Sequence, residues 1–185
     1  MRAFSTLIIA AALALSANAA ALDKRAVSAP VQLCIDDINS VAAQLAIVKT
    51  DVDNFTRSAG YSGALAVHNK EQVLETRLKK AGTDCCAVAG TVTAEEADAV
   101  IATVNTLVPQ VTAALSSIVT KKPEFDAILL ATALVKSDIK NLDTQTKTLD
   151  TCLIAKTPAS HLTAANALVA QINTSFASAK TAYGI

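Results

Sequence analysis

The chain carries few residues of the types that perform catalysis, and their spacing matches none of the common catalytic patterns. Its two histidines, His68 and His161, have no identifiable nucleophile beside them. No G-x-S-x-G, H-E-x-x-H, P-loop or dinucleotide-binding glycine motif occurs. The acidic pairs at 36–37 and 95–96 fall in the first turns of expected helices, where carboxylates complement the helix dipole. We therefore expect solvated histidines, no enzymatic activity, no cofactor and no metal site.

The first 25 residues predict export from the cell. Arg2 precedes a short apolar run over 7–15 and the A-x-A sequence at 17–19, a combination typical of a secretory signal peptide. The run is too short to span a bilayer. Lys24 and Arg25 form a dibasic processing site. We predict a signal peptide over 1–19, a propeptide over 20–25 and a single mature domain over 26–185 that is secreted to the extracellular space.

Helical periodicity dominates the mature segment. Apolar residues recur at spacings of three and four, and no stretch alternates with period two. Thr93 and Glu96 form a capping box, Pro109 should kink the helix in which it lies, and Gly60 and Gly82 should end helices. Five helices are expected, over 30–57, 62–81, 93–120, 123–155 and from Pro158 to Tyr183. Because the links are short, successive helices should be antiparallel, in an all-α up-down bundle of about five amphipathic helices.

Four cysteines in an exported chain predict two disulfides. Cys34 lies at the start of the first expected helix, Cys85 and Cys86 follow the second, and Cys152 lies in the last turn of the fourth. The up-down topology gathers these positions at one pole, and a disulfide needs Cα atoms within about 7 Å of one another. A bond between the two adjacent cysteines would be strained. One of them should reach Cys34 and the other Cys152, and the sequence leaves the pairing open.

Charge and composition limit the classes of ligand that the domain can bind. Without the predicted leader, thirteen basic and fifteen acidic residues remain, so the domain lacks the basic surface that nucleic-acid binding requires. Alanine is abundant, tryptophan is absent and aromatic residues make up 3% of the chain. Small side chains allow either close helix packing or helices held apart around a cavity suited to an acyl chain, and the sequence alone does not decide between the two. Asn54 and Asn173 begin sequons for N-glycosylation.

The mature segment resembles the fungal hydrophobic surface-binding protein A family, also called the cell wall galactomannoprotein family. The similarity rests on the dibasic site, the opening sequence at 34–38, the polar second helix running into Cys85 and Cys86, the helix start at 93–96 and Pro109. It implies a secreted or wall-associated helical protein without catalysis. Some members of the family adsorb to hydrophobic solids and recruit polyester-degrading hydrolases, and others hold long-chain fatty acids between their helices. Since the chain ends at Tyr183-Gly184-Ile185 without an apolar tail, we expect free secretion.

The leading hypothesis is therefore a secreted, non-enzymatic protein that binds hydrophobic surfaces or holds a long-chain fatty acid between its helices, and that recruits a secreted hydrolase. The alternatives are a proteinaceous inhibitor of a secreted hydrolase and a structural wall mannoprotein without a ligand. The candidate lipid-facing residues lie on the apolar faces of the expected helices: Leu45, Val48, Val104, Val111, Leu115, Val135, Ile139, Val169 and Ile172.

Overall fold

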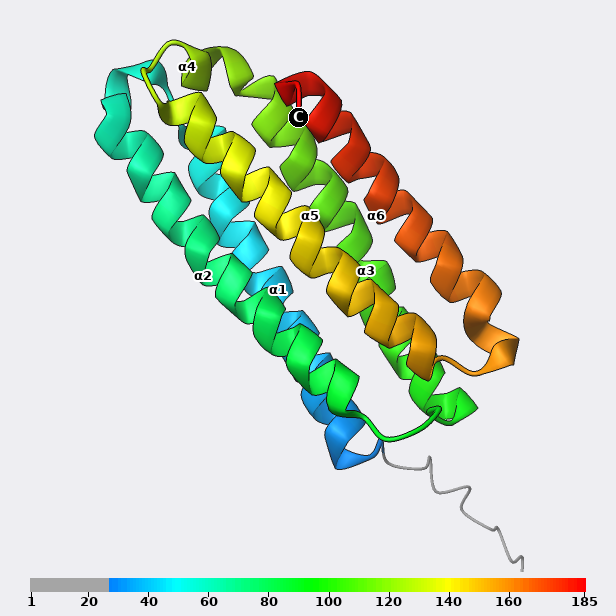
Figure 1. Cartoon of the computed structure of the whole chain (residues 1–185). Helices are drawn as coiled ribbons and strands as arrows, with labels where there is room; N and C mark the ends of the chain where they lie inside the picture. The colour runs from blue at the N-terminus through cyan, green and yellow to red at the C-terminus, as the bar shows by residue number, and fades with distance from the viewer. Residues whose placement is uncertain (1–26) are drawn as a thin grey trace, which may run out of the picture.

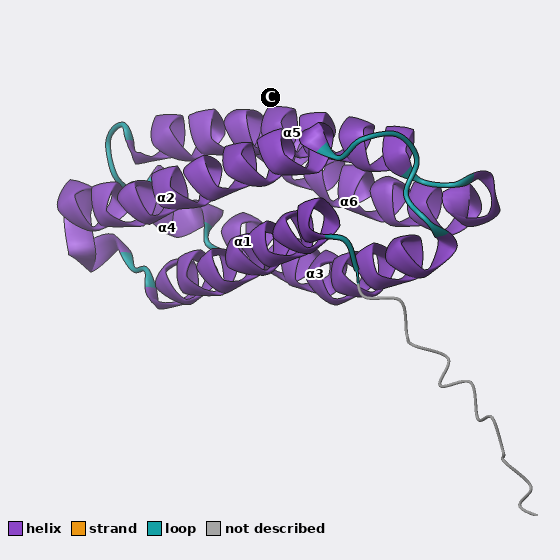
Figure 2. Ribbon diagram, turned by 90° about the horizontal axis from the view of Figure 1, so that it is seen from below, coloured by secondary structure: helices purple, strands orange, loops and turns teal. Residues whose placement is uncertain are grey.

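The computed structural model describes residues 27–185, which form helices joined by short turns and contain no strand (Figures 1 and 2). The predicted all-α bundle with two disulfides at one pole is confirmed. The predicted signal peptide and the Lys24-Arg25 site lie outside the described residues. The helices are α1 (Ala29–Asn54), α2 (Gly60–Ala87), α3 (Ala94–Thr120), the short α4 (Lys122–Asp126), α5 (Ala131–Lys156) and α6 (Leu162–Tyr183), with 3-10 turns at Arg57–Ala59 and Ala159–His161.

The five long helices pack in a ring whose order differs from their order in the chain. Each contacts two neighbours, in the sequence α1, α2, α5, α6, α3 and back to α1. Helices that follow one another along the chain are antiparallel, whereas the neighbours α2 and α5 run parallel, as does α3 with both α1 and α6 (Figure 1). With neighbouring axes about 9 Å apart, each axis in a ring of five lies about 8 Å from the centre, against about 6 Å in a ring of four. The ring therefore leaves room along its axis.

The expected fourth helix over 123–155 is wrong, because the structure divides it into α4 and α5. Phe125 is buried and stacks on Phe55, with ring centroids 4.1 Å apart. This contact fixes α4 across the end of the bundle, and the chain must then reverse into α5. Leu130 makes the reversal with a φ of 71°, a left-handed conformation that is uncommon outside glycine. Ile128 precedes Thr132 by four positions and Val135 by seven, which is helical spacing. The periodic pattern therefore continues across the break and could not reveal it.

The expected ends of the first two helices are also corrected. Gly60, expected to follow the first helix, begins α2 instead, with a φ of 62°. Gly82 does not stop α2, which continues to Ala87. An internal glycine costs a helix only about 1 kcal/mol, and burial of Cys85 against α1 offsets that cost. The adjacent cysteines thus belong to the last turn of α2 rather than to a following loop.

The pole where α1 begins and α2 and α5 end carries both disulfides. Cys34 pairs with Cys85 and Cys86 pairs with Cys152, with Cα atoms 4.7 and 5.0 Å apart. This resolves the pairing that the sequence left open. The bonds close long segments of the chain, and each stabilises the fold by about 4 kcal/mol in the chain-entropy model.

The capping box that begins α3 is present and also joins two helices. The Thr93 hydroxyl accepts from the Glu96 amide at 3.2 Å, and the Glu96 carboxylate accepts from the Thr93 amide at 3.0 Å. Glu96 also accepts from the Ser28 amide at 3.0 Å. The hydrogen bonds from Ser28 and Thr93 lower the pKa of Glu96 to about 2. α3 then continues through Pro109 to Thr120, as the periodicity predicted.

By length and composition alone, α1 and α3 are each apolar enough to cross a membrane. In the bundle, however, most of the large apolar residues of both helices belong to one cluster of buried and partly buried side chains that extends over all five long helices. Leu33 and Ile47 of α1 are exposed exceptions. A smaller share of α3 than of α1 is buried.

Candidate functional site: an apolar cavity inside the helix ring

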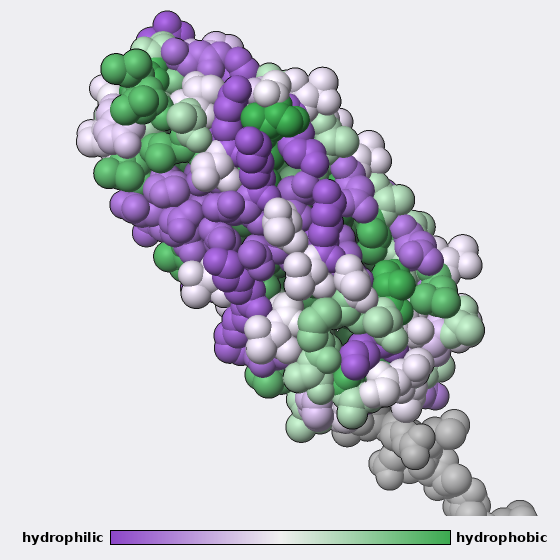
Figure 3. Space-filling view, viewed as in Figure 1, coloured by the Kyte–Doolittle hydropathy of each residue, from purple (hydrophilic) through white to green (hydrophobic). Residues whose placement is uncertain are grey.

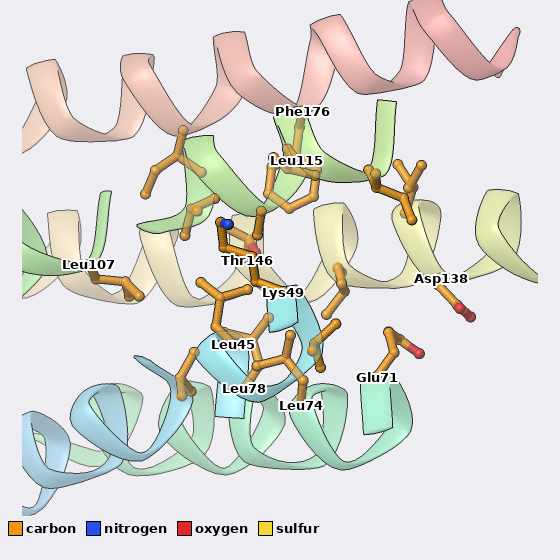
Figure 4. Close-up of a pocket in the computed structure, with 18 of the residues that line it drawn as sticks. Leu45, Lys49, Glu71, Leu74, Leu78, Leu107, Leu115, Asp138, Thr146 and Phe176 are labelled. Atoms are coloured by element: carbon orange, nitrogen blue, oxygen red, sulfur yellow. The ribbon is translucent and has the colours of Figure 1, made fainter. Parts of the chain in front are cut away.

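A long cavity occupies the axis of the ring (Figure 4). Side chains from all five long helices line it, and nearly all of them are aliphatic. The empty space, including its openings to solvent, amounts to about 1090 Å³. Its aliphatic lining residues are Ile38, Val41, Leu45, Val48, Val52, Val67, Leu74, Leu78, Val104, Leu107, Val111, Ala114, Leu115, Ile118, Val135, Ile139, Leu142, Leu149, Leu153 and Ile172.

The length of the cavity follows from helix geometry. On α1 the lining extends from Ile38 to Val52, and on α5 from Val135 to Leu153. At 1.5 Å per residue these stretches measure about 20 to 27 Å. One acyl chain occupies about 15 Å, half the thickness of a bilayer's hydrocarbon core. The cavity is long enough for an extended long-chain acyl group.

Eight of the nine residues proposed as lipid-facing line this cavity: Leu45, Val48, Val104, Val111, Leu115, Val135, Ile139 and Ile172. Val169 does not, because it lies on the half-buried flank of α6. Its neighbour Leu168 is the buried residue at that level, and it contributes to a groove between α3 and α6 instead. Contact of the eight residues with a lipid stays a prediction.

Two polar side chains, Lys49 and Thr146, enter the middle of the cavity (Figure 4). Lys49 is the one cation among the residues that line it. Its ammonium lies 2.6 Å from Asp53 Oδ2, and its side chain is 35% exposed. Hydrogen bonds from Lys49 and Ser117 lower the pKa of Asp53. The ammonium is thus held near the cavity but is not fully enclosed, so it can exchange partners.

A cluster of acidic side chains reaches the cavity from α2 and α5. Glu71 and Asp138 point toward one another at one end of it (Figure 4). Both are buried, and Glu71 Oε1 has no hydrogen-bond partner. Burial and the neighbouring charge of Asp138 raise the pKa of Glu71 to about 8, and burial raises the pKa of Asp138 to about 7. The two groups compete for protons near neutral pH.

His68 belongs to this cluster, so the expectation that it is solvated is wrong. Its Nδ1 lies 2.8 Å from Asp138 Oδ1, and its side chain is 22% exposed. Glu71 is three positions after His68, which places both on the face of α2 that meets α5. The polarity of the neighbouring sequence at 69–71 concealed this contact. A sequence signal was present, however, because Glu71 occupies a position in the apolar series Val67, Leu74 and Leu78.

Asp150 is a further buried acid that the sequence analysis missed. It lies on α5 twelve residues beyond Asp138, about 18 Å along the helix. Its Oδ2 has no hydrogen-bond partner, and burial raises its pKa to about 6. A carboxyl group in such a setting holds its proton to a higher pH than an exposed one.

The other polar residues singled out in the sequence serve the fold. The expectation of a solvated side chain is wrong for His161 too, because that side chain is 18% exposed and its Nε2 lies 3.0 Å from Oδ1 of the exposed Asp98. Of the acidic pair at 36–37, Asp37 accepts from Lys80 at 2.7 Å. Asn54 is exposed at the end of α1, and Asn173 is half-buried within α6. Glycosylation at either position stays a prediction.

Comparisons with known proteins bear on both the fold and the cavity. The family model described as hydrophobic surface binding protein A matches residues 31–155. A comparison with curated proteins finds no significant match. Among solved structures, the chain is similar to AFMP4P in complex with palmitic acid, at 24% identity over 83% of this chain and 99% of that one, with a TM-score of 0.78.

Two further similar structures come from the MP1 protein of Penicillium marneffei. Ligand binding domain 1, complexed with arachidonic acids, has a TM-score of 0.76 at 13% identity and covers 84% of this chain and 99% of that one. Ligand binding domain 2, complexed with multiple arachidonic acids, has a TM-score of 0.73 at 16% identity and covers 83% and 94%. At these identities the likeness establishes the shared fold.

Proposed function

The chain belongs to the hydrophobic surface binding protein A family, and from that premise we propose that it is a non-enzymatic carrier of a long-chain fatty acid held along the axis of the helix ring. The observation that carries the proposal is the cavity, which is aliphatic over most of its length and longer than a single acyl chain. The similar solved structures are complexes with palmitic and arachidonic acids. An apolar cavity with a few polar groups is the common form of a lipid site.

The polar residues suggest how the ligand is oriented. A fatty-acid carboxylate needs a cation or hydrogen-bond donors, and Lys49 and Thr146 provide both near the middle of the cavity. Glu71, Asp138 and Asp150 would repel an ionised carboxylate wherever they are themselves ionised. We therefore place the carboxylate beside Lys49 and the acyl chain among the aliphatic residues toward the disulfide pole.

The occupancy of the cavity can be tested with one substitution. Ala114 lines the cavity, and in an Ala114→Phe variant the added ring should occupy the space that the acyl chain needs. We expect binding of palmitate to weaken at least about tenfold without loss of helicity, measured by native mass spectrometry of protein from a secreting eukaryotic host after lipid extraction. Ala102, exposed on the same helix, provides the matched control Ala102→Phe. Equal binding by both variants would contradict an internal site.

The role of Lys49 can be tested by comparing two lysine-to-methionine variants. In a Lys49→Met variant the ligand carboxylate loses a charge-assisted hydrogen bond of about 1.5–3 kcal/mol, so palmitate should bind about 10 to 100 times more weakly. Binding of hexadecanol, which has no charge, should change little. Lys147 also pairs with an aspartate one turn away but does not line the cavity, so Lys147→Met is the control.

Adsorption to hydrophobic surfaces is a second candidate function, favoured by the end of the bundle where α4 lies. Leu129 and Leu130 in the α4–α5 turn are 85% and 63% exposed, and Tyr61 and Leu65 at the start of α2 are also exposed. Figure 3 shows apolar residues gathered at this end of the molecule, beside the hydrophilic surface of α2 and α5. Substitution of Leu129 and Leu130 by serine should reduce adsorption to a hydrophobic sensor, whereas Val73→Ser, elsewhere on α2, should not.

Extracellular release is also part of the proposal. It is supported by the two disulfides, which persist in oxidising compartments, and by the leader read from the sequence. Intact-mass measurement of the secreted protein should give an N-terminus at Ala26. Recruitment of a secreted hydrolase stays a prediction, and the alternatives of a hydrolase inhibitor and a structural wall mannoprotein stay untested.

A further inference from the structure

The polar cluster between α2 and α5 has more acceptors than donors. His68 Nδ1, one oxygen of Glu71 and one oxygen of Asp138 lie within 4.8 Å of one another. Gln72 donates to Glu71 Oε2 at 2.8 Å, while Glu71 Oε1 is buried without a partner. The nearby Glu75 is paired with Lys79 at 2.7 Å. An unsatisfied buried carboxylate oxygen destabilises the fold by about 1–3 kcal/mol or more, and a bound cation would satisfy it.

The three groups lie close enough for one ion to contact all of them. His68 and Asp138, whose nearest atoms are 2.8 Å apart, would exchange their direct contact for bonds to that ion. His68 and Glu71 lie three residues apart on α2, and Asp138 faces them from α5. Bundle proteins build metal sites from carboxylates on facing helices together with a glutamate and a histidine three positions apart, in the order Glu-x-x-His. Here the spacing is the same and the order is reversed, His68 preceding Glu71. A further contact fixes the helix that bears them, since the buried Gln44 on α1 donates to the Lys70 carbonyl at 2.9 Å. The ligands are therefore positioned by packing.

We propose that His68, Glu71 and Asp138 bind a divalent transition-metal ion of the Zn²⁺ type at the edge of the cavity. One imidazole nitrogen and two carboxylates form a three-ligand set of the kind that leaves a fourth position open for water or another ligand. Two carboxylates also balance the charge of the ion. Ca²⁺ is a poor fit, because it takes six to eight oxygen ligands. Partial exposure of His68 provides the route by which the ion enters.

Titration with Zn²⁺ tests the site without reference to lipid binding. The full chain is produced in a secreting host, stripped of metal and lipid, and titrated with ZnCl₂ by isothermal calorimetry; CoCl₂ is added separately, because its absorption spectrum reports the ligand set. We expect one Zn²⁺ per chain, no binding of CaCl₂ at the same concentration, and a four-coordinate cobalt spectrum. His68→Gln and, independently, Glu71→Gln should each weaken Zn²⁺ binding at least about tenfold, with helicity confirmed by circular dichroism.

The second histidine provides a matched control. His161 also lies against an aspartate, Asp98, at 3.0 Å, but it belongs to no group of three such ligands among the described residues. His161→Gln should therefore leave Zn²⁺ affinity unchanged. Absence of stoichiometric binding by the unmodified chain would overturn the proposal. So would retention of full affinity by both His68→Gln and Glu71→Gln, or loss of binding in His161→Gln.

Discussion

The two ends of the bundle are held together by different kinds of interaction. At the disulfide pole, Cys34–Cys85 joins α1 to α2 and Cys86–Cys152 joins α2 to α5. At the opposite α4 pole, the contacts are noncovalent and include the stack of Phe125 on Phe55 and the bidentate Arg57–Glu124 ion pair. Covalent closure at one end and noncovalent packing at the other lead us to expect that the ring opens more readily at the α4 pole.

The largest expected effect comes from removing the covalent closure. Replacing Cys86 and Cys152 together by serine should lower the free energy of unfolding by about 4 kcal/mol. Replacing Cys34 and Cys85 together should cost nearly the same, because the two bonds span 66 and 51 residues and loop entropy varies slowly with length. Urea unfolding of the two double variants checks this. A loss below about 1 kcal/mol would show that this pole does not depend on its disulfides.

The Phe125→Ala substitution tests how far the α4 pole depends on noncovalent packing. The ring is almost completely buried and stacked on Phe55, so its removal should cost about 3–5 kcal/mol. Hydrogen exchange should accelerate around α4 and at the end of α1 but not beside the cysteines. Uniform acceleration over the whole bundle would contradict the difference between the poles.

Asp150 makes the disulfide pole sensitive to pH. Burial raises its pKa to about 6 from 3.8, so between these values the folded chain binds more protons than the unfolded chain. Stability should therefore fall as pH rises through that window, by up to about 3 kcal/mol, and then level off. Asp150→Asn should remove this component, as measured by urea unfolding from pH 3.5 to 7.5.

Asp143, on the same helix, provides a control, because its pKa is shifted in the opposite direction from that of Asp150. Burial raises its pKa, but the ion pairs with Lys180 and Lys147 outweigh that effect and the net shift is downward. Its contribution to stability should be present at neutral pH and lost as pH falls. Asp143→Asn should thus destabilise the protein at pH 7, where Asp150→Asn stabilises it. The same sign for both variants would refute the assignment.

The smallest effect concerns the turn at the α4 pole. Leu130 has a φ of 71°, which costs a leucine about 1–3 kcal/mol, part of which is offset by the lower entropy of its unfolded state. Leu130→Gly should therefore raise the free energy of unfolding by about 1 kcal/mol while reducing adsorption to hydrophobic surfaces. Leu129→Ser removes a comparable apolar group without relieving the backbone. It should reduce adsorption and leave stability nearly unchanged.

Much of the local structure could be predicted from the sequence, because it depends on residues close together in the chain. Periodic apolar positions specified five long helices and the inward faces that now line the cavity. Thr93 and Glu96 specified the start of α3, and the cysteine positions, combined with short links, placed both disulfides at one pole. Two weak local signals gave wrong helix boundaries. Gly82 was expected to end a helix but lies inside α2, and the apolar residues before Ala131 gave no sign of the break between α4 and α5.

The tertiary structure alone decided the features that depend on which helices become neighbours. A periodic pattern identifies the apolar face of a helix but not the helix opposite it, so neither the ring order nor the parallel pairing of α2 with α5 could be read from the chain. The cavity follows from that order, because five helices in a ring cannot fill its centre with aliphatic side chains of this size. The meeting of His68 and Glu71 with Asp138, seventy residues away from His68, follows for the same reason. Burial and charge at a site depend on groups that are distant in sequence and adjacent only after folding.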